Sequence, residues 1–225
     1  MQSKIIVMLT HNDQTVSNAL TVFEQCKDLP VDFWGFKDVG LPKDQMRALH
    51  GAMKAAGKRT FLEVVTYTPE ACMQGAKLAI EFGFDCLMGT LLYPEVWDYL
   101  KDKPIEYFPF VGDVTGSPSI LRGTARSMIE QANVFHGQGI HGVDILAYRL
   151  ADGDPEALAR DFVKGAKLKV VIAGSIGSAE RIAVVNEINP YGFTMGSALF
   201  TENFVKGGSF RENLEAVLKT MDALS

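Results

Sequence analysis

Cysteines are few in the 225-residue sequence, and their arrangement excludes two common uses of this residue. Cys26, Cys72 and Cys86 are odd in number, lie far apart and form no C-x-x-C pair. A disulfide framework needs paired cysteines, and a cysteine zinc site needs closely spaced ones. The sequence therefore predicts a reducing compartment. A chain of this length can bury a core large enough to fold without disulfide or metal staples.

Long hydrophobic runs are also missing. The apolar stretch near the N-terminus, KIIVML, is too short for a signal peptide or a membrane span. No later segment reaches the roughly 18 uninterrupted apolar residues of a transmembrane helix. We therefore expect a cytoplasmic protein with no membrane partner.

Runs of basic residues are absent as well. The sequence holds 22 Lys and Arg against 27 Asp and Glu, and its formal net charge is -5. The basic residues are spread along the chain, whereas nucleic-acid-binding proteins usually carry a basic stripe or patch. The sequence therefore predicts no nucleic-acid partner.

No Pro-, Ser- or Gly-rich linker divides the chain, so we expect residues 1–225 to form a single domain. The first apolar segment is not followed by G-x-G-x-x-G, which disfavours a dinucleotide-binding domain.

Short apolar segments alternate with segments of helical periodicity from end to end, a pattern typical of repeated βα units. The predicted strands are 4–9, 32–37, 60–66, 86–90, 107–111, 143–149, 169–173 and 192–197. The predicted helices are 15–28, 42–56, 69–82, 94–102, 122–137, 155–165, 178–188 and 210–223. Eight such units predict an α/β fold, a TIM (β/α)8 barrel with a parallel eight-stranded sheet. A doubly wound open sheet is the competing architecture.

A weak repeat sets the expected register of three strands. The strings VDFWGFK, FDCLMGT and VDILAYR each place an aspartate shortly before a strand-like run. We expect Asp32, Asp85 and Asp144 at the amino-terminal ends of their strands, away from a barrel active site. Five residues further on, we expect inward-facing side chains near the carboxyl ends: Lys37, Thr90 and Arg149.

Two glycine-containing turns end the predicted seventh and eighth strands. The first contains Gly174 and Ser175 and precedes a predicted helix, and the second contains Gly196 and Ser197. Glycine lets the backbone approach a ligand closely, and a helix N-terminus favours an anion. Adjacent strands bring such turns to one place, so the sequence predicts a phosphate site there. The alternative is that these glycines only form tight turns.

The same residues carry a resemblance to a known family. Residues 169–200 resemble the phosphate-binding segment of the ribulose-phosphate-binding and related (β/α)8 barrels. In those families an A-G-G-I-like turn is followed about twenty residues later by G-S-A-I/L. Here the turns read AGSI and GSAL, so Ser175 replaces the second glycine. The resemblance implies a phosphorylated small-molecule ligand, but it identifies no single reaction.

Lys37 ends the predicted strand 32–37, and Glu63 lies in the middle of the neighbouring predicted strand 60–66, within apolar surroundings. A buried carboxylate is unfavourable unless it is paired or protonated, so we expect the two side chains to form a pair inside the barrel. Lys37 is a candidate to bind an anion, stabilise an enolate or form an imine, and Glu63 to transfer a proton. The alternative is a purely structural ion pair. The D-x-K-x-x-D motif of sugar-phosphate decarboxylases is absent.

Three further residues are predicted at the barrel mouth. His11 follows the first strand and is a candidate acid or base. Asp113 begins a long loop, 113–121, which is a candidate lid and carries a second candidate acid or base. Arg149 offers a planar fork for a phosphate or a carboxylate.

These observations predict an enzyme of carbon metabolism that acts on a small phosphorylated sugar or a keto or hydroxy acid. The expected step is proton abstraction next to a carbonyl, as in an isomerase, an epimerase or an aldolase- or decarboxylase-type lyase. The alternative is a non-catalytic regulatory barrel that senses a phosphorylated metabolite. We predict no cofactor and no metal site. Asp38, Glu63 and Asp113 could together bind Mg²⁺, but no spacing in the sequence requires such a site. A homo-oligomer is also left open.

Overall fold

Eight parallel strands form the centre of the computed structural model, which describes residues 3–224. Their order around the sheet is β10-β11-β12-β1-β4-β5-β6-β7. Their bounds are β1 (Lys4–Met8), β4 (Phe33–Lys37), β5 (Arg59–Glu63), β6 (Cys86–Met88), β7 (Glu106–Phe108), β10 (Gly142–Ile145), β11 (Lys169–Ile172) and β12 (Gly192–Met195).

The seam between the first and last strands of this order is closed by backbone hydrogen bonds. The Asp144 N–H donates to the Pro109 carbonyl at 3.0 Å, and the Val111 N–H donates to the Asp144 carbonyl at 3.2 Å. Phe110 and Asp144 form the corresponding parallel bridge. The architecture is therefore the predicted TIM barrel rather than the open sheet.

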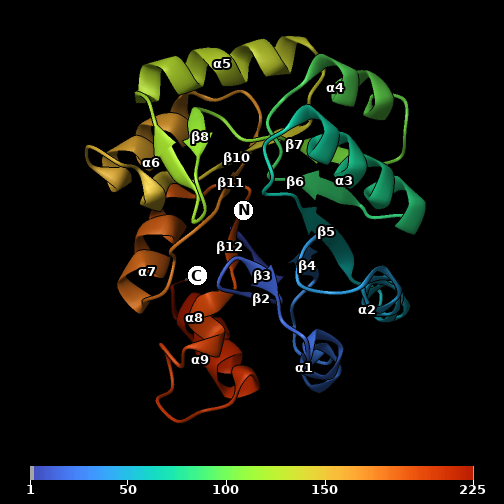
Figure 1. The fold of residues 1–225 in the computed structure, drawn as a ribbon. Helices are drawn as coiled ribbons and strands as arrows, with labels where there is room; N and C mark the ends of the chain where they lie inside the picture. Colours follow the sequence, from blue (N-terminus) through green and yellow to red (C-terminus); the bar gives the residue numbers. More distant parts are fainter. Residues whose placement is uncertain (1–2, 225) are drawn as a thin grey trace.

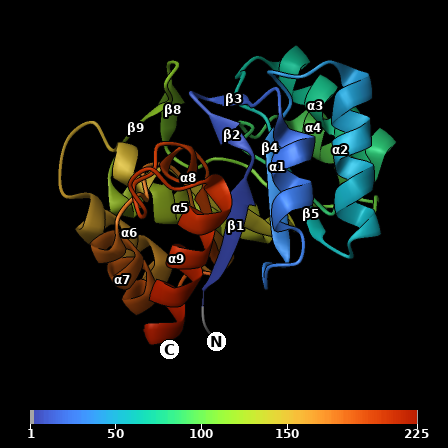
Figure 2. The same cartoon turned by 90° about the horizontal axis from the view of Figure 1, so that it is seen from below.

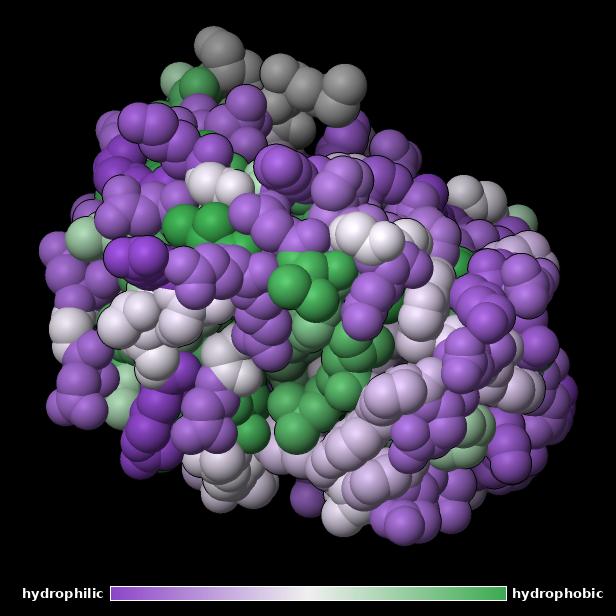
Figure 3. All heavy atoms as spheres, turned by 90° about the horizontal axis from the view of Figure 1, so that it is seen from above, coloured by the Kyte–Doolittle hydropathy of each residue, from purple (hydrophilic) through white to green (hydrophobic). Residues whose placement is uncertain are grey.

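Helices surround the strands on the outside (Figure 1). They are α1 (Ala19–Cys26), α2 (Lys43–Ala55), α3 (Pro69–Phe82), α4 (Pro94–Leu100), α5 (Ala125–Gly137), α6 (Pro155–Gly165), α7 (Ala179–Ile188) and α9 (Phe210–Ala223). Over α4 and α5, hydrophilic side chains surround small apolar patches (Figure 3). None of the helices among residues 3–224 is both long enough and apolar enough to span a bilayer.

Local sequence signals fix several helix ends. The Thr68 side chain accepts a hydrogen bond from the Ala71 N–H at 3.2 Å, and Pro69 follows it where a missing N–H is tolerated. Gly83 ends α3 in a left-handed conformation with φ of 81°. These signals explain why the predicted bounds of α3 agree with the structure.

The two faces of each strand pack into different apolar clusters. Inside the barrel, the cluster contains Ile6, Met8, Phe61, Cys86, Met88, Phe108 and Val171. The intervening residues, such as Val7 and Leu62, pack against the helices in a larger outer cluster. Because side chains alternate along a strand, the register decides which polar residues must also lie inside.

Short elements that were not predicted occupy the carboxyl ends of the strands. They are the hairpins β2 (Thr10–His11) with β3 (Gln14–Thr15) and β8 (Asp113–Thr115) with β9 (Ile120–Arg122), the 3-10 helix η1 (Ala147–Arg149) and α8 (Ser197–Phe200). Figure 2 shows both hairpins at one end of the barrel and the end of α9 at the other.

The predicted strand 143–149 is too long, and the predicted register of Asp144 is wrong. The strand β10 covers only 142–145, so Asp144 is its third residue and not its start. Asp144 shares the inward-facing parity of Gly142, whose α-carbon faces the ring of Phe108. The aspartate repeat does not mark equivalent positions, because Asp32 and Asp85 do precede their strands.

Thr90 also differs from expectation. It follows β6, and its hydroxyl lies 2.5 Å from the hydroxyl of Tyr107. The ring of Tyr107 belongs to the outer cluster, so Thr90 points outward and not into the barrel. Gly89 between β6 and Thr90 has φ of 85°, which interrupts the alternation along the strand.

The narrow barrel interior predicts a clear effect of one added methyl group. A Cβ at Gly142 would overlap the Phe108 ring, so Gly142→Ala should lower the free energy of unfolding by about 1–3 kcal/mol. Gly51→Ala is the control, because Gly51 is an exposed residue within α2 with no atom near its added Cβ. It should raise the same free energy by up to about 1 kcal/mol. Urea denaturation of both variants checks this, and equal effects would contradict the packing described.

Candidate functional site

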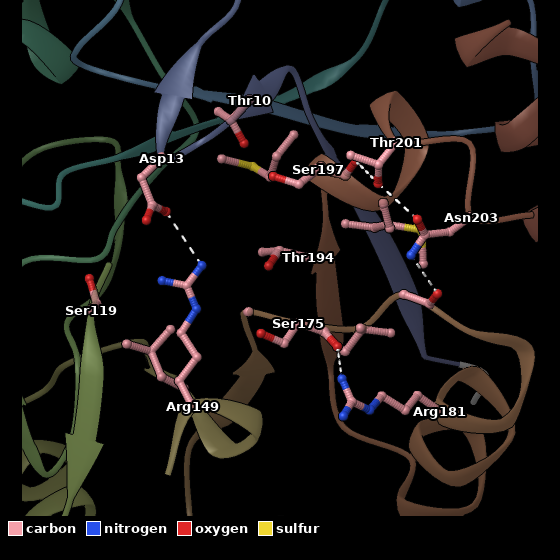
Figure 4. Close-up of a pocket in the computed structure, with 18 of the residues that line it drawn as sticks. Thr10, Asp13, Ser119, Arg149, Ser175, Arg181, Thr194, Ser197, Thr201 and Asn203 are labelled. Carbon is pink, nitrogen blue, oxygen red and sulfur yellow. Dashed lines mark hydrogen bonds and ion pairs between the residues drawn. The ribbon is translucent and has the colours of Figure 1, made fainter. Parts of the chain in front are cut away.

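A cavity of about 520 Å³ lies at the carboxyl ends of the strands. It lies between the β2–β3 hairpin, the β8–β9 hairpin and the turns that follow β11 and β12. Most of the side chains that line it are polar (Figure 4). The lining includes Thr10, Asp13, Lys37, Glu63, Ser119, Arg149, Ser175, Arg181, Thr194, Ser197, Thr201 and Asn203.

Lys37 and Glu63 lie side by side on the inner face of the barrel. They are direct partners in the register of β4 and β5, and Lys37 Nζ lies 3.8 Å from Glu63 Oε2. Only 5% of Lys37 and 7% of Glu63 is exposed. The predicted pair is therefore present, and its two charges lie where each offsets the burial of the other.

Asp13 is a second carboxylate partner of Lys37, and it was not among the predicted site residues. Asp13 Oδ1 lies 2.8 Å from Lys37 Nζ and 3.4 Å from an Arg149 nitrogen. Figure 4 shows Arg149 extending across the cavity toward Asp13. Burial raises the pKa of Asp13, but the hydrogen bond and charge of Lys37, followed by those of Arg149, lower it below its usual value of 3.8. The carboxylate therefore links both cations.

A tight turn explains the position of Asp13. Asn12 and Asp13 have φ of 49° and 58° and connect two antiparallel strands, as in a type I′ hairpin. Asn and Asp tolerate this conformation best after glycine. The signal in the sequence was the Asn-Asp pair between two Thr-containing segments, which predicts a two-residue hairpin rather than an irregular loop.

Thr15 attaches this hairpin to the strand that carries Lys37. The Lys37 N–H donates to Thr15 Oγ1 at 2.9 Å, and the Thr15 hydroxyl donates to the Lys37 carbonyl at 2.8 Å. Thr15 is buried, so these hydrogen bonds are protected from water. Asp13 is thereby held over the lysine.

The first glycine turn lies on the opposite side of the cavity. Gly174 has φ of 79°, and an added Cβ would lie 2.8 Å from Arg149 Nε. Ser175 also adopts a left-handed conformation, with φ of 59°, so it takes the backbone shape usual for the glycine it replaces. Such a conformation is unfavourable for serine and concentrates at functional sites. The Ser178 side chain then caps α7 by accepting from the Arg181 N–H at 3.3 Å.

The second glycine turn follows β12 and begins α8. A Cβ at Gly196 would lie 2.7 Å from Thr10 Oγ1 and 2.9 Å from the Thr10 carbonyl, so only glycine fits this approach. The first N–H groups of a helix have no partner within it, and the turns before α7 and α8 lead into such groups. Both turns line the same cavity.

Asn203 connects the two turns. Its Nδ2 donates to the Gly177 carbonyl at 3.0 Å, and its Oδ1 lies 2.8 Å from Thr201 Oγ1. Thr201 Oγ1 in turn lies 2.9 Å from the Ser197 carbonyl (Figure 4). The single hydroxyl hydrogen of Thr201 serves one of these two acceptors at a time, so the bond from Asn203 to Gly177 is the constant link between the segments after β11 and β12. The sequence analysis did not identify Asn203, which follows the matched segment.

Arg181 lies at the outer edge of the first turn. Its guanidinium donates to the Ser175 carbonyl and lies 4.8 Å from the ring centre of Tyr148. Arg149 and Arg181 thus place two guanidinium groups along the wall formed by Gly174 and Ser175. Guanidinium groups suit phosphate and carboxylate oxygens.

The structure places two predicted residues outside the cavity lining. His11 lies on β2 with its ring centre 6.1 Å from that of Phe200. Asp113 is exposed at the start of β8, in a hairpin rather than at a strand end. The predicted lid segment does reach the cavity, but through Ser119, whose hydroxyl bonds the Tyr67 hydroxyl.

Asp144 also belongs to this end of the barrel, contrary to the prediction that excluded it. It is fully buried, and burial first and then the charge of Glu63 raise its pKa well above 3.8, although Lys37 and Arg149 oppose the shift. Among residues 3–224, no group of three or more His, Cys, Asp or Glu side chains is arranged to hold a metal ion.

No protein-family model and no curated protein sequence matches the chain. Solved structures match it in fold. The tryptophan synthase alpha chain from Legionella pneumophila is 16% identical with a TM-score of 0.67, and the match covers 99% of this chain and 92% of that one. The 3-hexulose-6-phosphate synthase from Salmonella typhimurium is 13% identical with a TM-score of 0.69, and the match covers 99% of this chain and 100% of that one.

A third similar structure is a glycerol uptake operon antiterminator-related protein from Thermotoga maritima. It is 16% identical with a TM-score of 0.55, and the match covers 88% of this chain and 98% of that one. At such identities the likeness shows the fold alone. It confirms the predicted (β/α)8 barrel.

Proposed function

We propose that this barrel is an enzyme that binds a small phosphorylated sugar or a phosphorylated keto or hydroxy acid and abstracts a proton next to its carbonyl group. One observation carries the proposal: a single cavity is lined by both glycine turns and by the Lys37–Glu63 pair. The turns supply a phosphate-binding end, and the pair supplies an acid–base end.

The phosphate group would bind between the turns at Gly174–Ser178 and Gly196–Ser197. The residues of both turns line the cavity there, their backbone N–H groups would donate to the phosphate oxygens, and Arg149 and Arg181 add positive charge. Binding this non-reacting group fixes the position of the rest of the substrate, which lowers the entropic barrier of the reaction. The similar folds include an enzyme whose name specifies a hexulose 6-phosphate product, which supports this class of ligand.

At the other end, Glu63 would accept the proton from the carbon next to the carbonyl. Lys37 Nζ, 3.8 Å from Glu63 Oε2, would stabilise the negative charge that develops on the carbonyl oxygen. Asp13 holds the lysine in place through its 2.8 Å contact. Imine formation by Lys37 is the other route to the same carbanion, and it would require the ammonium to lose a proton first.

A regulatory barrel that binds a phosphorylated metabolite without turnover is the second candidate. The fold similarity to a protein described as related to an operon antiterminator favours considering it. A thermal-shift screen of phosphorylated sugars and acids, followed by an NMR assay of each stabilising compound, separates the two. Stabilisation with product formation supports the enzyme, and stabilisation without any product supports the regulator.

Replacing Lys37 tests the acid–base end. Lys37→Ala should lower kcat by at least about a hundredfold, because it removes the cation at the developing oxyanion. Lys37→Arg keeps the charge but cannot form an imine. Residual turnover by this variant, together with no borohydride trapping of substrate on the wild type, indicates electrostatic stabilisation. Lys43→Ala removes an exposed lysine that contacts Glu81 at 2.7 Å and should leave kcat unchanged. Near-normal turnover by a folded Lys37→Ala protein would remove Lys37 from the mechanism.

Replacing Asn203 tests the phosphate-binding end. Asn203→Ala deletes the connection between the two turns and should weaken binding of inorganic phosphate by about three- to tenfold, in line with the loss of one or two hydrogen bonds. Asn186→Ala also deletes an asparagine hydrogen bond, to the Leu224 carbonyl at 3.0 Å, but outside the cavity. Isothermal titration calorimetry should show unchanged affinity for this control. Equal affinities in all three proteins would argue against the phosphate site.

A further inference from the structure

Asp144 has no hydrogen-bond partner for its carboxyl group. Its backbone forms the closing seam of the barrel, and its side chain shares the inward-facing parity of β10. The residue is 0% exposed, and neither carboxyl oxygen has a partner among residues 3–224. Buried polar groups in proteins are nearly always hydrogen-bonded, so a buried carboxyl without partners calls for a physical explanation.

The charges around Asp144 do not balance if every acid is ionised. Two cations, Lys37 and Arg149, act on four carboxyl groups in this part of the barrel: Asp13, Asp38, Glu63 and Asp144. Asp13 contacts both cations, and Glu63 contacts Lys37 at 3.8 Å. No ion pair among residues 3–224 includes Asp144 or Asp38.

Among residues 3–224, Lys37 and Arg149 are the cations that act on Asp144, whereas Arg59 and Lys169, which act on the neighbouring Cys86, are each paired with Glu106. Tyr67 interacts electrostatically with both Glu63 and Asp144, and burial raises its pKa to about 12, so it stays neutral. Cys86 is buried inside the barrel, and burial holds its thiol neutral too by raising its pKa. Arg181 is engaged by the Ser175 carbonyl and the ring of Tyr148. A negative charge on Asp144 would therefore be uncompensated, which is strongly unfavourable in a buried position.

We propose that Asp144 is a positioning residue that stays protonated at neutral pH in the barrel interior near Glu63, so that these two carboxyl groups together carry one negative charge. The inference rests on the proposed role of Glu63 as the base. During the reaction the substrate carbon–hydrogen bond breaks, its proton moves to a Glu63 oxygen, and its electron pair moves toward the carbonyl oxygen. Asp144 keeps its own proton throughout.

Because protonated Asp144 carries no charge, it does not compete with the substrate for the ammonium group of Lys37. When Glu63 becomes neutral, Asp13 is the carboxylate that stays in contact with Lys37 Nζ, and the ammonium hydrogens that face Glu63 can turn to the new oxyanion. An ionised Asp144 would compete for the same ammonium group. The burial of Asp144 below the cavity lining explains how it acts without touching the substrate.

Proton linkage gives a test that needs no substrate. A carboxyl group protonated in the folded state but ionised in the unfolded state favours the folded protein at low pH, and this contribution is lost as the pH rises through the folded-state pKa. The unfolding equilibrium constant of the wild type, divided by that of Asp144→Asn, should therefore rise about tenfold for each pH unit above pH 5. A ratio that stays constant from pH 5 to 8, or falls, would overturn the proposal.

Isotope-edited infrared spectroscopy keeps the proposal testable if Asp144→Asn does not fold. Wild-type protein with ¹³C-labelled aspartate should show a shifted band of a protonated carboxyl group at pH 7. Glu63→Gln removes the neighbouring negative charge, so the band should titrate away at a lower pH than in the wild type. Asp113→Asn, which replaces an exposed aspartate outside the cavity, should leave the band unchanged. Absence of the wild-type band would contradict the proposal. Phosphate binding, measured separately, tests the proposed function.

Discussion

Closure of a parallel barrel forces every second strand residue into a narrow interior, and the candidate site follows from this constraint. Hydrogen bonds between the segments around β7 and β10 complete the ring. The lower interior is filled by apolar side chains such as Phe61 and Phe108. At the carboxyl end the same alternation brings in Lys37 and Glu63, which must then be compensated within the protein.

The electrostatics of the site are shared between the barrel and the segments that cover it. Asp13 contacts Lys37 from a hairpin, and Arg149 contacts Asp13 from a 3-10 helix, so neither residue comes from a strand. The positive ends of α7 and α8 lie on the other side of the cavity. A substrate with one anionic end and one acidic carbon–hydrogen bond would meet complementary groups at both ends. Short connecting segments thus complete a site that the strands begin.

The sequence was sufficient for the fold because local and long-range signals agree. Pro69, Pro155 and the amphipathic segment 210–223 marked helices whose ends the structure reproduces. The Lys37–Glu63 pair was predictable because the two residues belong to neighbouring predicted strands and a buried carboxylate needs a partner. Asp144 was misplaced because a strand's first residue cannot be read from a weak repeat. The position of Asp13 depends on a two-residue hairpin, and the position of Asn203 depends on how two distant turns meet. A one-residue change in either would redirect the side chain.

A crystal structure of the protein with inorganic phosphate would show whether both glycine turns bind one anion beside the Lys37–Glu63 pair. The account predicts one phosphate ion between the turns at 174–178 and 196–198, held by backbone amides of both, with Arg149 or Arg181 beside it. The ion should lie in the same cavity as Lys37 and Glu63. A phosphate bound elsewhere, or an empty cavity at a phosphate concentration that stabilises the protein, would contradict the account.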